Sequence, residues 1–215
     1  KAARYDRLKF LLAEGLVTSS GPVWQLHRRM LNKGFAAAMY EGFVNVFVAK
    51  TKDILNKWKE EDVEEVHFTQ EIGLLSYSII SKAGFGYDAN ISGTCSESFG
   101  PQAVSLMLDE VNHRLSQPTE YRHYLRPARK RKVDAAIKKA DDLIMDIIER
   151  RVKEKQEKEG GESDLLNVLL RARDDEKTGA EGSLSPREMR DHIFTFLAAG
   201  TETTATTVSW VILEL

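Results

Sequence analysis

The sequence predicts an all-α fold, and three observations support this prediction. Apolar side chains recur at three- and four-residue steps along several segments, which is the spacing of a helix with one buried face. Alternating strand patterns are nearly absent, since the run at residues 63–66 is too short to count. Ser185, Pro186 and Glu188 form a capping box with proline at the first helical position, a strong helix start. We therefore expect long helices packed into one domain over residues 1–215.

The expected elements follow this pattern along the chain. The three clearest amphipathic helices are expected at 40–58, 68–83 and 133–152. Shorter helices are expected at 22–32, about 98–116 and 164–173. Glycine, serine and charged residues gather in loops at 86–97, 154–163 and 174–185. A last helix over 186–215 would be about 45 Å long.

The composition excludes several classes of protein. The 31 Lys and Arg residues nearly balance the 33 Asp and Glu residues, and this argues against a dedicated nucleic-acid binder. A single cysteine, Cys95, excludes an internal disulfide framework and a multi-cysteine zinc site. The basic run at 126–132 is expected to be a solvated loop that leads into a charged helix. The chain has no starting Met and stops within an apolar run at Leu215, so we expect a piece of a longer protein.

The last apolar segment, residues 193–213, carries the most informative pattern. Its only charge is Glu202, but six threonines and a capped start argue against a membrane span. We expect a helix buried on most sides, with the glutamate buried beside hydroxyl groups. Gly200 and its neighbouring threonines, whose hydroxyls can bond carbonyls one turn back, predict a kink and a small polar notch. On composition alone, a ligand site with a proton relay and a satisfied polar cluster in a core are equally good interpretations.

A family resemblance favours the ligand site. Residues 199–204, Ala-Gly-Thr-Glu-Thr-Thr, resemble the [A/G]-G-x-[D/E]-T-[T/S] signature of the central I helix of cytochrome P450 monooxygenases. Trp24 and Arg28 form a W-x-x-x-R that is similar to the family's C helix, and residues 85–88 resemble its F-G-x-D turn. These motifs occur in the family's order, and the resemblance covers essentially the whole chain.

The resemblance implies a role for particular residues. Trp24 and Arg28 would bind a propionate of haem b, and Ala199 and Gly200 would lie against the haem with Thr203. Indole and guanidinium groups are hydrogen-bond donors that suit a carboxylate, and residues four apart share one face of a helix. Thr203 would hold a water beside the bound dioxygen, and Glu202 would relay protons. Phe196 and Ala199 would face the substrate.

The implied activity is the insertion of one oxygen atom of O2 into an apolar organic substrate. Electrons would come from NADPH through a reductase partner, and no nucleic acid is expected as a partner. The resemblance also implies that the full-length protein is associated with the endoplasmic reticulum membrane through an N-terminal region outside this chain. The chain itself is expected to be soluble.

The iron ligand is expected outside this chain. In the family a cysteine within F-x-x-G-x-R-x-C-x-G binds the iron, and that motif does not precede Cys95. We therefore expect a partial catalytic domain that is inactive alone. Two alternatives stay open at this point: a truncated, non-catalytic helical product that acts as an interaction module, and an unrelated all-α ligand-binding bundle.

Overall fold

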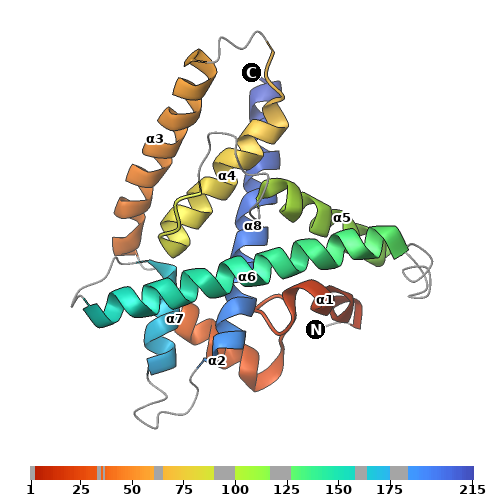
Figure 1. Ribbon diagram of the computed structural model, residues 1–215, viewed down its shortest axis with the longest axis vertical. Helices are drawn as coiled ribbons and strands as arrows, with labels where there is room; N and C mark the ends of the chain where they lie inside the picture. The colour runs from red at the N-terminus through yellow and green to blue at the C-terminus, as the bar shows by residue number, and fades with distance from the viewer. Residues whose placement is uncertain are drawn as a thin grey trace.

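The computed structural model describes residues 3–32, 35, 37–60, 65–89, 100–116, 127–157, 164–174 and 184–215. These residues form helices and no strand, and this confirms the predicted all-α fold (Figure 1). The elements are a 3-10 helix at Ala3–Leu8, α1 at Lys9–Leu12, α2 at Gly21–Asn32, α3 at Ala37–Glu60, α4 at Phe68–Phe85, α5 at Pro101–Ser116, α6 at Pro127–Glu157, α7 at Leu165–Asp174 and α8 at Pro186–Leu213.

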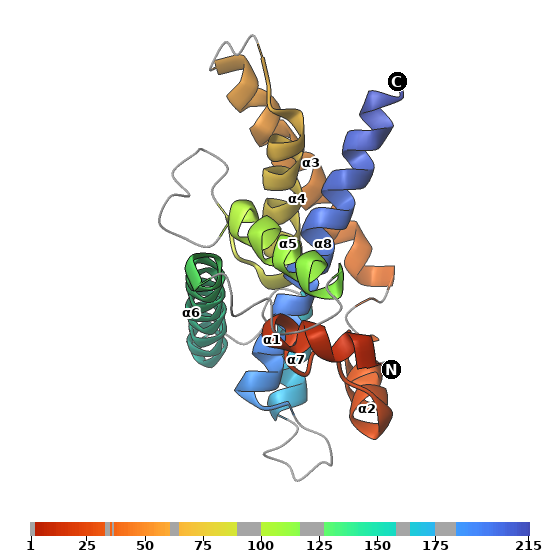
Figure 2. The same cartoon turned by 90° about the vertical axis from the view of Figure 1, so that its right-hand side faces the viewer.

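Helix α8 is the axis of the molecule. Figure 1 shows it running from the lower part of the molecule to the top, with α6 crossing it, and Figure 2 shows α4 and α5 beside its middle. The predicted capping box is confirmed, because Ser185 Oγ accepts a hydrogen bond from the Glu188 N–H at 3.3 Å. In return, Glu188 Oε2 accepts one from the Ser185 N–H at 2.8 Å. The helix therefore starts where the sequence places it.

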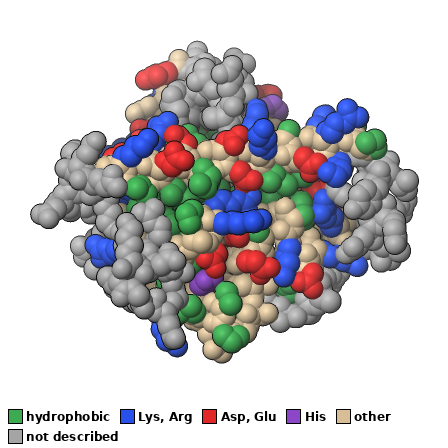
Figure 3. Space-filling view, turned by 60° about the horizontal axis from the view of Figure 1, so that its bottom comes forward, with side chains coloured by type: hydrophobic (Ala, Val, Ile, Leu, Met, Phe, Trp, Pro, Cys, Tyr) green, Lys and Arg blue, Asp and Glu red, His purple; other side chains and the backbone are tan. Residues whose placement is uncertain are grey.

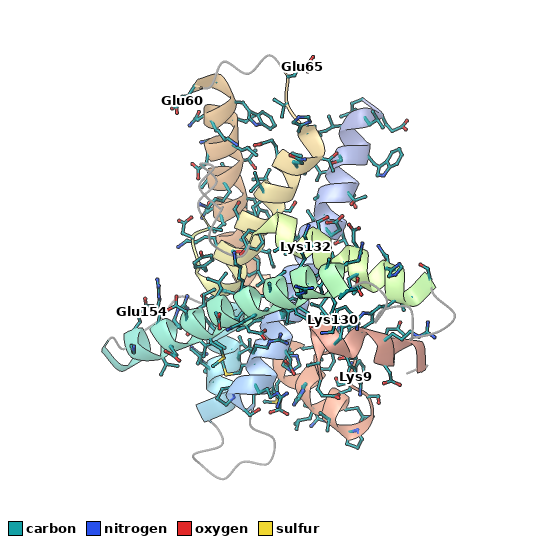
Figure 4. The ribbon with its side chains drawn as sticks, turned by 45° about the vertical axis from the view of Figure 1, so that its right-hand side comes forward. Lys9, Glu60, Glu65, Lys130, Lys132 and Glu154 are labelled. Carbon is teal, nitrogen blue, oxygen red and sulfur yellow. The ribbon has the colours of Figure 1, made fainter. Side chains whose placement is uncertain are left out.

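The basic run belongs to helix α6, so the prediction of a solvated loop is wrong for residues 127–132. Pro127 occupies the first turn of the helix, where its missing N–H costs nothing. Arg129 Nε donates to Glu110 Oε2 at 2.8 Å, and Lys130 pairs with Asp134 one turn ahead. Figure 4 shows Lys130 and Lys132 along α6. Basic and acidic side chains are interspersed on the face shown in Figure 3, which agrees with a mixed surface.

Two buried ionic contacts hold helices together. Glu110 of α5 is fully buried and receives hydrogen bonds from Arg114 on its own helix and from Arg129 on α6. Arg151 of α6 donates to Asp164 Oδ2 at 2.7 Å and to the carbonyl of Phe85 at 3.1 Å. These contacts fix the ends of α4, α6 and α7 relative to one another.

The turn that follows α4 explains its glycine. Gly86 has φ of 66°, and the N–H groups of Gly86 and Tyr87 donate to carbonyls in the last turn of the helix. A Cβ atom at Gly86 would lie 1.9 Å from Arg151 Nη2, so a side chain there would displace the arginine. Glycine is therefore required both by the turn and by the arginine packed over it.

The N-terminal segment docks onto the first half of α8, and the sequence did not predict its short helices. The Glu14 N–H donates to Asp191 Oδ2 at 3.2 Å, and Arg190 donates to the carbonyl of Leu11 at 3.3 Å. At Gly15 a Cβ atom would lie 2.3 Å from Thr195 Oγ1, so the two backbones approach closely. Within the part of the chain that the structure describes, no helix has the length and apolar content needed to cross a membrane.

Candidate functional site

The signature residues lie where α8 changes from buried to exposed. From Met189 to Ala198 most side chains are buried, and the buried hydrophobic ones are Met189, Ile193, Phe194, Leu197 and Ala198. From Ala199 onward most side chains are exposed, including Glu202, Thr203 and Thr204. The prediction that the helix is buried on most sides, and that its glutamate is buried, is therefore wrong for the second half. There α4 and α5 cover one flank of α8, and they bury Thr201 and Ala205.

The threonine hydroxyls bond to the helix backbone, as the sequence predicts. Thr201 Oγ1 donates to the carbonyl of Leu197 at 2.7 Å, and Thr203 Oγ1 donates to the carbonyl of Ala199 at 2.6 Å. Because a hydroxyl has one proton, Thr203 Oγ1 in this state is left with lone pairs that accept. The helix is continuous over Pro186–Leu213, and the predicted kink stays a prediction.

One side of α8 carries both the signature and the contacts to α2. At about 100° of rotation per residue, His192, Phe196, Ala199 and Thr203 fall within an arc of about 60°. His192 Nε2 lies 3.1 Å from Nδ1 of His27 on α2, and the ring centroid of Phe196 lies 5.7 Å from that of Phe35, which follows α2 in the chain. Ala199 and Thr203, one and two turns beyond, are exposed. The face of α8 that meets α2 thus continues into an open surface formed by the signature.

Helix α2 brings the second motif to this side of the molecule. Trp24 is half-buried, while Arg28, one turn later, is exposed. Within the described ranges Arg28 makes no ion pair. Its guanidinium is therefore available for an anion, and the indole N–H one turn away is a further donor on the same side of the helix. Because His27 points to α8, these two residues flank the contact between the helices.

Glu202 borders a cavity between α4, α5 and α8. The cavity has a volume of about 340 Å³, and it opens to solvent. Its polar lining includes Gln70 of α4, Asp109 of α5, and Thr201 and Thr206 of α8. Glu202 is therefore an exposed carboxylate at a cavity open to solvent, on the flank of α8 next to the face formed by Ala199 and Thr203.

Gly200 serves helix packing in this structure. A Cβ atom there would lie 2.9 Å from Cγ1 of Ile80 on α4, which is too close for a real contact. The resemblance implies that Gly200 lies against the haem, whereas the direction of its missing side chain is occupied by Ile80. Gly200, Phe196 and Thr204 also border an apolar cavity of about 210 Å³ between α3, α4 and α8. Phe196 is thus packed beside Phe35 and this cavity.

The two histidines at the α2–α8 contact were not predicted as a pair. They lie 165 residues apart in the chain, and no motif links them, so only the folded structure brings them together. His192 is fully buried, and burial lowers its pKa to about 4, helped by the neighbouring His27. Burial also lowers the pKa of His27, although Glu188 at 3.6 Å opposes that shift. Both imidazoles are therefore neutral near pH 7.

Metal-ligating side chains do not gather in the described residues. There, no group of three or more His, Cys, Asp or Glu side chains has the arrangement to hold an ion. Cys95 lies outside the residues that the structure describes.

Comparison with known proteins now places the chain. The family model of cytochrome P450 matches residues 1–215, the whole chain. Cytochrome P450 CYP749A22 of Panax ginseng is 29% identical over 96% of this chain, and human cytochrome P450 4F11 is 25% identical over 98%. The chain covers 39% and 42% of these two relatives, less than half of their length.

A solved structure shows the same fold. The crystal structure of a cytochrome P450, CYP102L1, superposes with a TM-score of 0.75 at 22% identity, covering 97% of this chain and 46% of that one. These findings do not favour the alternative of an unrelated helical bundle. With a family match over every residue and a shared helical fold, the chain belongs to the cytochrome P450 family, a family of haem monooxygenases.

Proposed function

We propose that this chain forms the dioxygen-facing part of a haem monooxygenase, acting within a longer polypeptide that supplies the cysteine ligand of the iron. The observation that carries the proposal is the open face of α8. Ala199 and Thr203 lie on the side of the helix that also contacts α2, the helix with Trp24 and Arg28. The contact between His27 and His192 thus brings the helix that carries Trp24 and Arg28 against the helix that carries Ala199 and Thr203.

The residues fit a haem group. Haem propionates are carboxylates, and Arg28 offers an exposed guanidinium without an ion pair in the described residues. Trp24, half-buried one turn earlier, carries an indole N–H on the same side of the helix. Ala199 has a small side chain and is exposed, so a flat ring can approach α8 there. Gly200 stands next to it, with its Cβ direction turned toward Ile80 and its backbone left free of side-chain bulk.

When bound, the haem iron supplies the binding site for dioxygen and the oxidising power for the substrate. The protein residues have separate tasks. Thr203 Oγ1 donates its hydrogen bond to the Ala199 carbonyl, so its lone pairs accept a hydrogen bond from a water on the open face. Glu202, at the solvent-open cavity with Asp109 and Gln70, exchanges a proton with bulk water and passes it toward that face.

The remaining parts of the proposal concern the whole enzyme. The substrate is an apolar organic molecule, and electrons come from NADPH through a reductase partner. The complete protein is held at the endoplasmic reticulum membrane by an N-terminal region. The curated relatives support these points only as members of the same family.

The test uses the polypeptide encoded by the complete gene, extended to the length of the relatives. We expect it to bind haem and to give the spectrum of a thiolate-bound iron when reduced under CO. Arg28→Leu should lower haem retention, and Arg28→Lys should restore part of it, because a charge without the planar fork remains. Failure of the extended wild-type polypeptide to bind haem would contradict the proposal, as would a thiolate-type spectrum from residues 1–215 alone.

A second measurement distinguishes the proposed proton-transfer residues, Glu202 and Thr203, from the residues proposed to bind the haem propionate, Trp24 and Arg28. Glu202→Gln and Thr203→Val should leave haem retention unchanged while lowering the amount of product formed per NADPH consumed. A matched control is Thr207→Val, because Thr207 is also exposed and also donates to the carbonyl four residues back. Equal effects of Thr203→Val and Thr207→Val would show that Thr203 has no special role.

A further inference from the structure

The contact between α2 and α8 contains an unusual buried pair of imidazoles. His27 and His192 are 2% and 0% exposed, and their rings meet edge to face with centroids 4.9 Å apart. Nε2 of His192 lies 3.1 Å from Nδ1 of His27. Nδ1 of His192 is buried without a partner in the described residues. Two polar rings are thus kept in a core position where apolar side chains would pack as well.

The surroundings assign the proton between the two rings. If His192 Nε2–H donates to His27 Nδ1, then the one N–H proton of neutral His27 is on Nε2, which faces Glu188 Oε1 at 3.6 Å. The opposite assignment would place a bare Nε2 lone pair of His27 against that carboxylate. It would also bury an N–H donor at His192 Nδ1 without an acceptor. The first arrangement is therefore favoured, with His192 as donor, His27 as acceptor and Glu188 as its electrostatic partner.

A hydrogen bond of this kind fixes the relative orientation of two helices more than it stabilises the fold. Apolar contacts, such as that between Phe35 and Phe196, allow helices to slide and rotate against each other at little cost. A single donor–acceptor pair is satisfied in one rotation and one height of α2. Replacing a buried polar contact by apolar groups often leaves stability unchanged, so the value of the pair lies in fixing one arrangement.

The pair stands between the two motifs that the proposed function uses. His27 precedes Arg28 and follows Trp24 by three residues, and His192 shares its face of α8 with Ala199 and Thr203. We propose that His192 is a positioning residue that, through its hydrogen bond to His27, sets the haem-binding side chains of α2 against the dioxygen-facing residues of α8. The inference rests on the proposed function, since it gives the link a purpose in cofactor binding.

The first experiment needs no haem. The 215-residue chain is labelled with 5-fluorotryptophan, and its three tryptophans are followed by fluorine NMR, with Trp24 assigned by Trp24→Phe. We expect His192→Phe to shift or broaden the Trp24 signal and to leave Trp58 and Trp210 unchanged. His192→Gln, which keeps a side-chain N–H donor, should partly restore the signal. The control is Ile144→Val, a conservative change in the buried face of α6.

The second experiment measures haem release from the extended polypeptide. His192→Phe should release haem about fivefold faster than the wild type, the factor that one neutral hydrogen bond accounts for. His192→Gln should lie between them, and the urea midpoint of His192→Phe should stay within the range set by Ile144→Val. An unchanged Trp24 signal, or haem release no faster than in Ile144→Val, would overturn the positioning role. If the wild-type polypeptide binds no haem, the proposed function fails, and the Trp24 signal alone still decides whether the link holds α2.

Discussion

The two halves of α8 have similar apolar sequences and opposite surroundings. The first half is enclosed by the N-terminal segment, α6 and α7, it meets α2 at His27, and Ile193 is 0% exposed. The second half touches α4 and α5 on one flank, and Ile212 is 48% exposed. Apolar composition therefore says where a helix can be buried, while the neighbouring elements decide where it is buried. The signature of the family lies at the boundary between the two halves, directly after the buried first half.

The largest expected effect contrasts the same substitution in the two halves. Ile193→Ala should lower the free energy of unfolding by about 2–5 kcal/mol, because it leaves a cavity in the core. Ile212→Ala should change it by about 0.5 kcal/mol or less, because the side chain is half in solvent. Urea denaturation of both variants measures the difference. Comparable losses would mean that the second half is as enclosed in solution as the first.

The next effect is a dependence of the free energy of unfolding on pH, which arises from His192 in the first half of α8. Between pH 6.5 and about 4 an unfolded histidine binds a proton, whereas His192, with its pKa lowered by burial to about 4, does not. Stability should therefore fall by about 3 kcal/mol as the pH drops through this window, and level off below it. The lowered pKa of His27 acts in the same direction.

The measurement is the urea midpoint at pH 7 and at pH 5 for the wild type and for His192→Phe. In His192→Phe, most of the decrease in stability between pH 7 and pH 5 should be absent. Glu188, whose pKa is lowered by its hydrogen bonds from Ser185 against the effect of burial, adds a loss of stability only at lower pH. Asp191, whose pKa is raised by burial, opposes that loss. A variant as sensitive to pH as the wild type would assign the dependence to other groups.

Much of the fold followed from local rules. The capping box at Ser185 located the start of α8, and three- and four-residue spacing located the other long helices. The short helices at the N-terminus were missed because they are held by distant partners such as Asp191 and Arg190. The basic run was misassigned for a related reason, since Glu110 and Asp134 neutralise it only once α5 and α6 are formed.

The site was predicted less completely. The signature and the W-x-x-x-R motif are visible in the sequence because each spans a few residues. The exposure of Glu202 and the contact of Gly200 with Ile80 depend on which helices lie beside α8, and periodicity does not contain that information. The link between His27 and His192 has no local signal at all, because its two halves are joined only by the tertiary fold.

A smaller effect tests the boundary itself. Gly200→Ala gains about 1 kcal/mol of helix propensity, but overpacking against Ile80 costs about 1–3 kcal/mol. We expect a net loss of about 1 kcal/mol in urea denaturation. Gly73→Ala is the matched control, because it lies in α4 with open space around its Cβ position and should be stabilising. The double variant Gly200→Ala/Ile80→Ala should show a positive coupling between the two sites, and strict additivity would mean that Ile80 is not the obstacle.

The smallest effect on stability is expected at the residue with the largest proposed role in chemistry. Thr203→Val removes an exposed hydroxyl whose only recorded bond runs to its own helix, so the free energy of unfolding should change by about 0.5 kcal/mol or less. Thr201→Val makes the same change at a buried position and should cost more, up to about 1.5 kcal/mol. If Thr203→Val lowered the free energy of unfolding more than Thr201→Val in the urea titration, Thr203 would belong to the packed part of α8 and not to the open face. A small loss at Thr203 is the result that a residue reserved for a ligand must give, because its hydroxyl then contributes to binding and catalysis instead of folding.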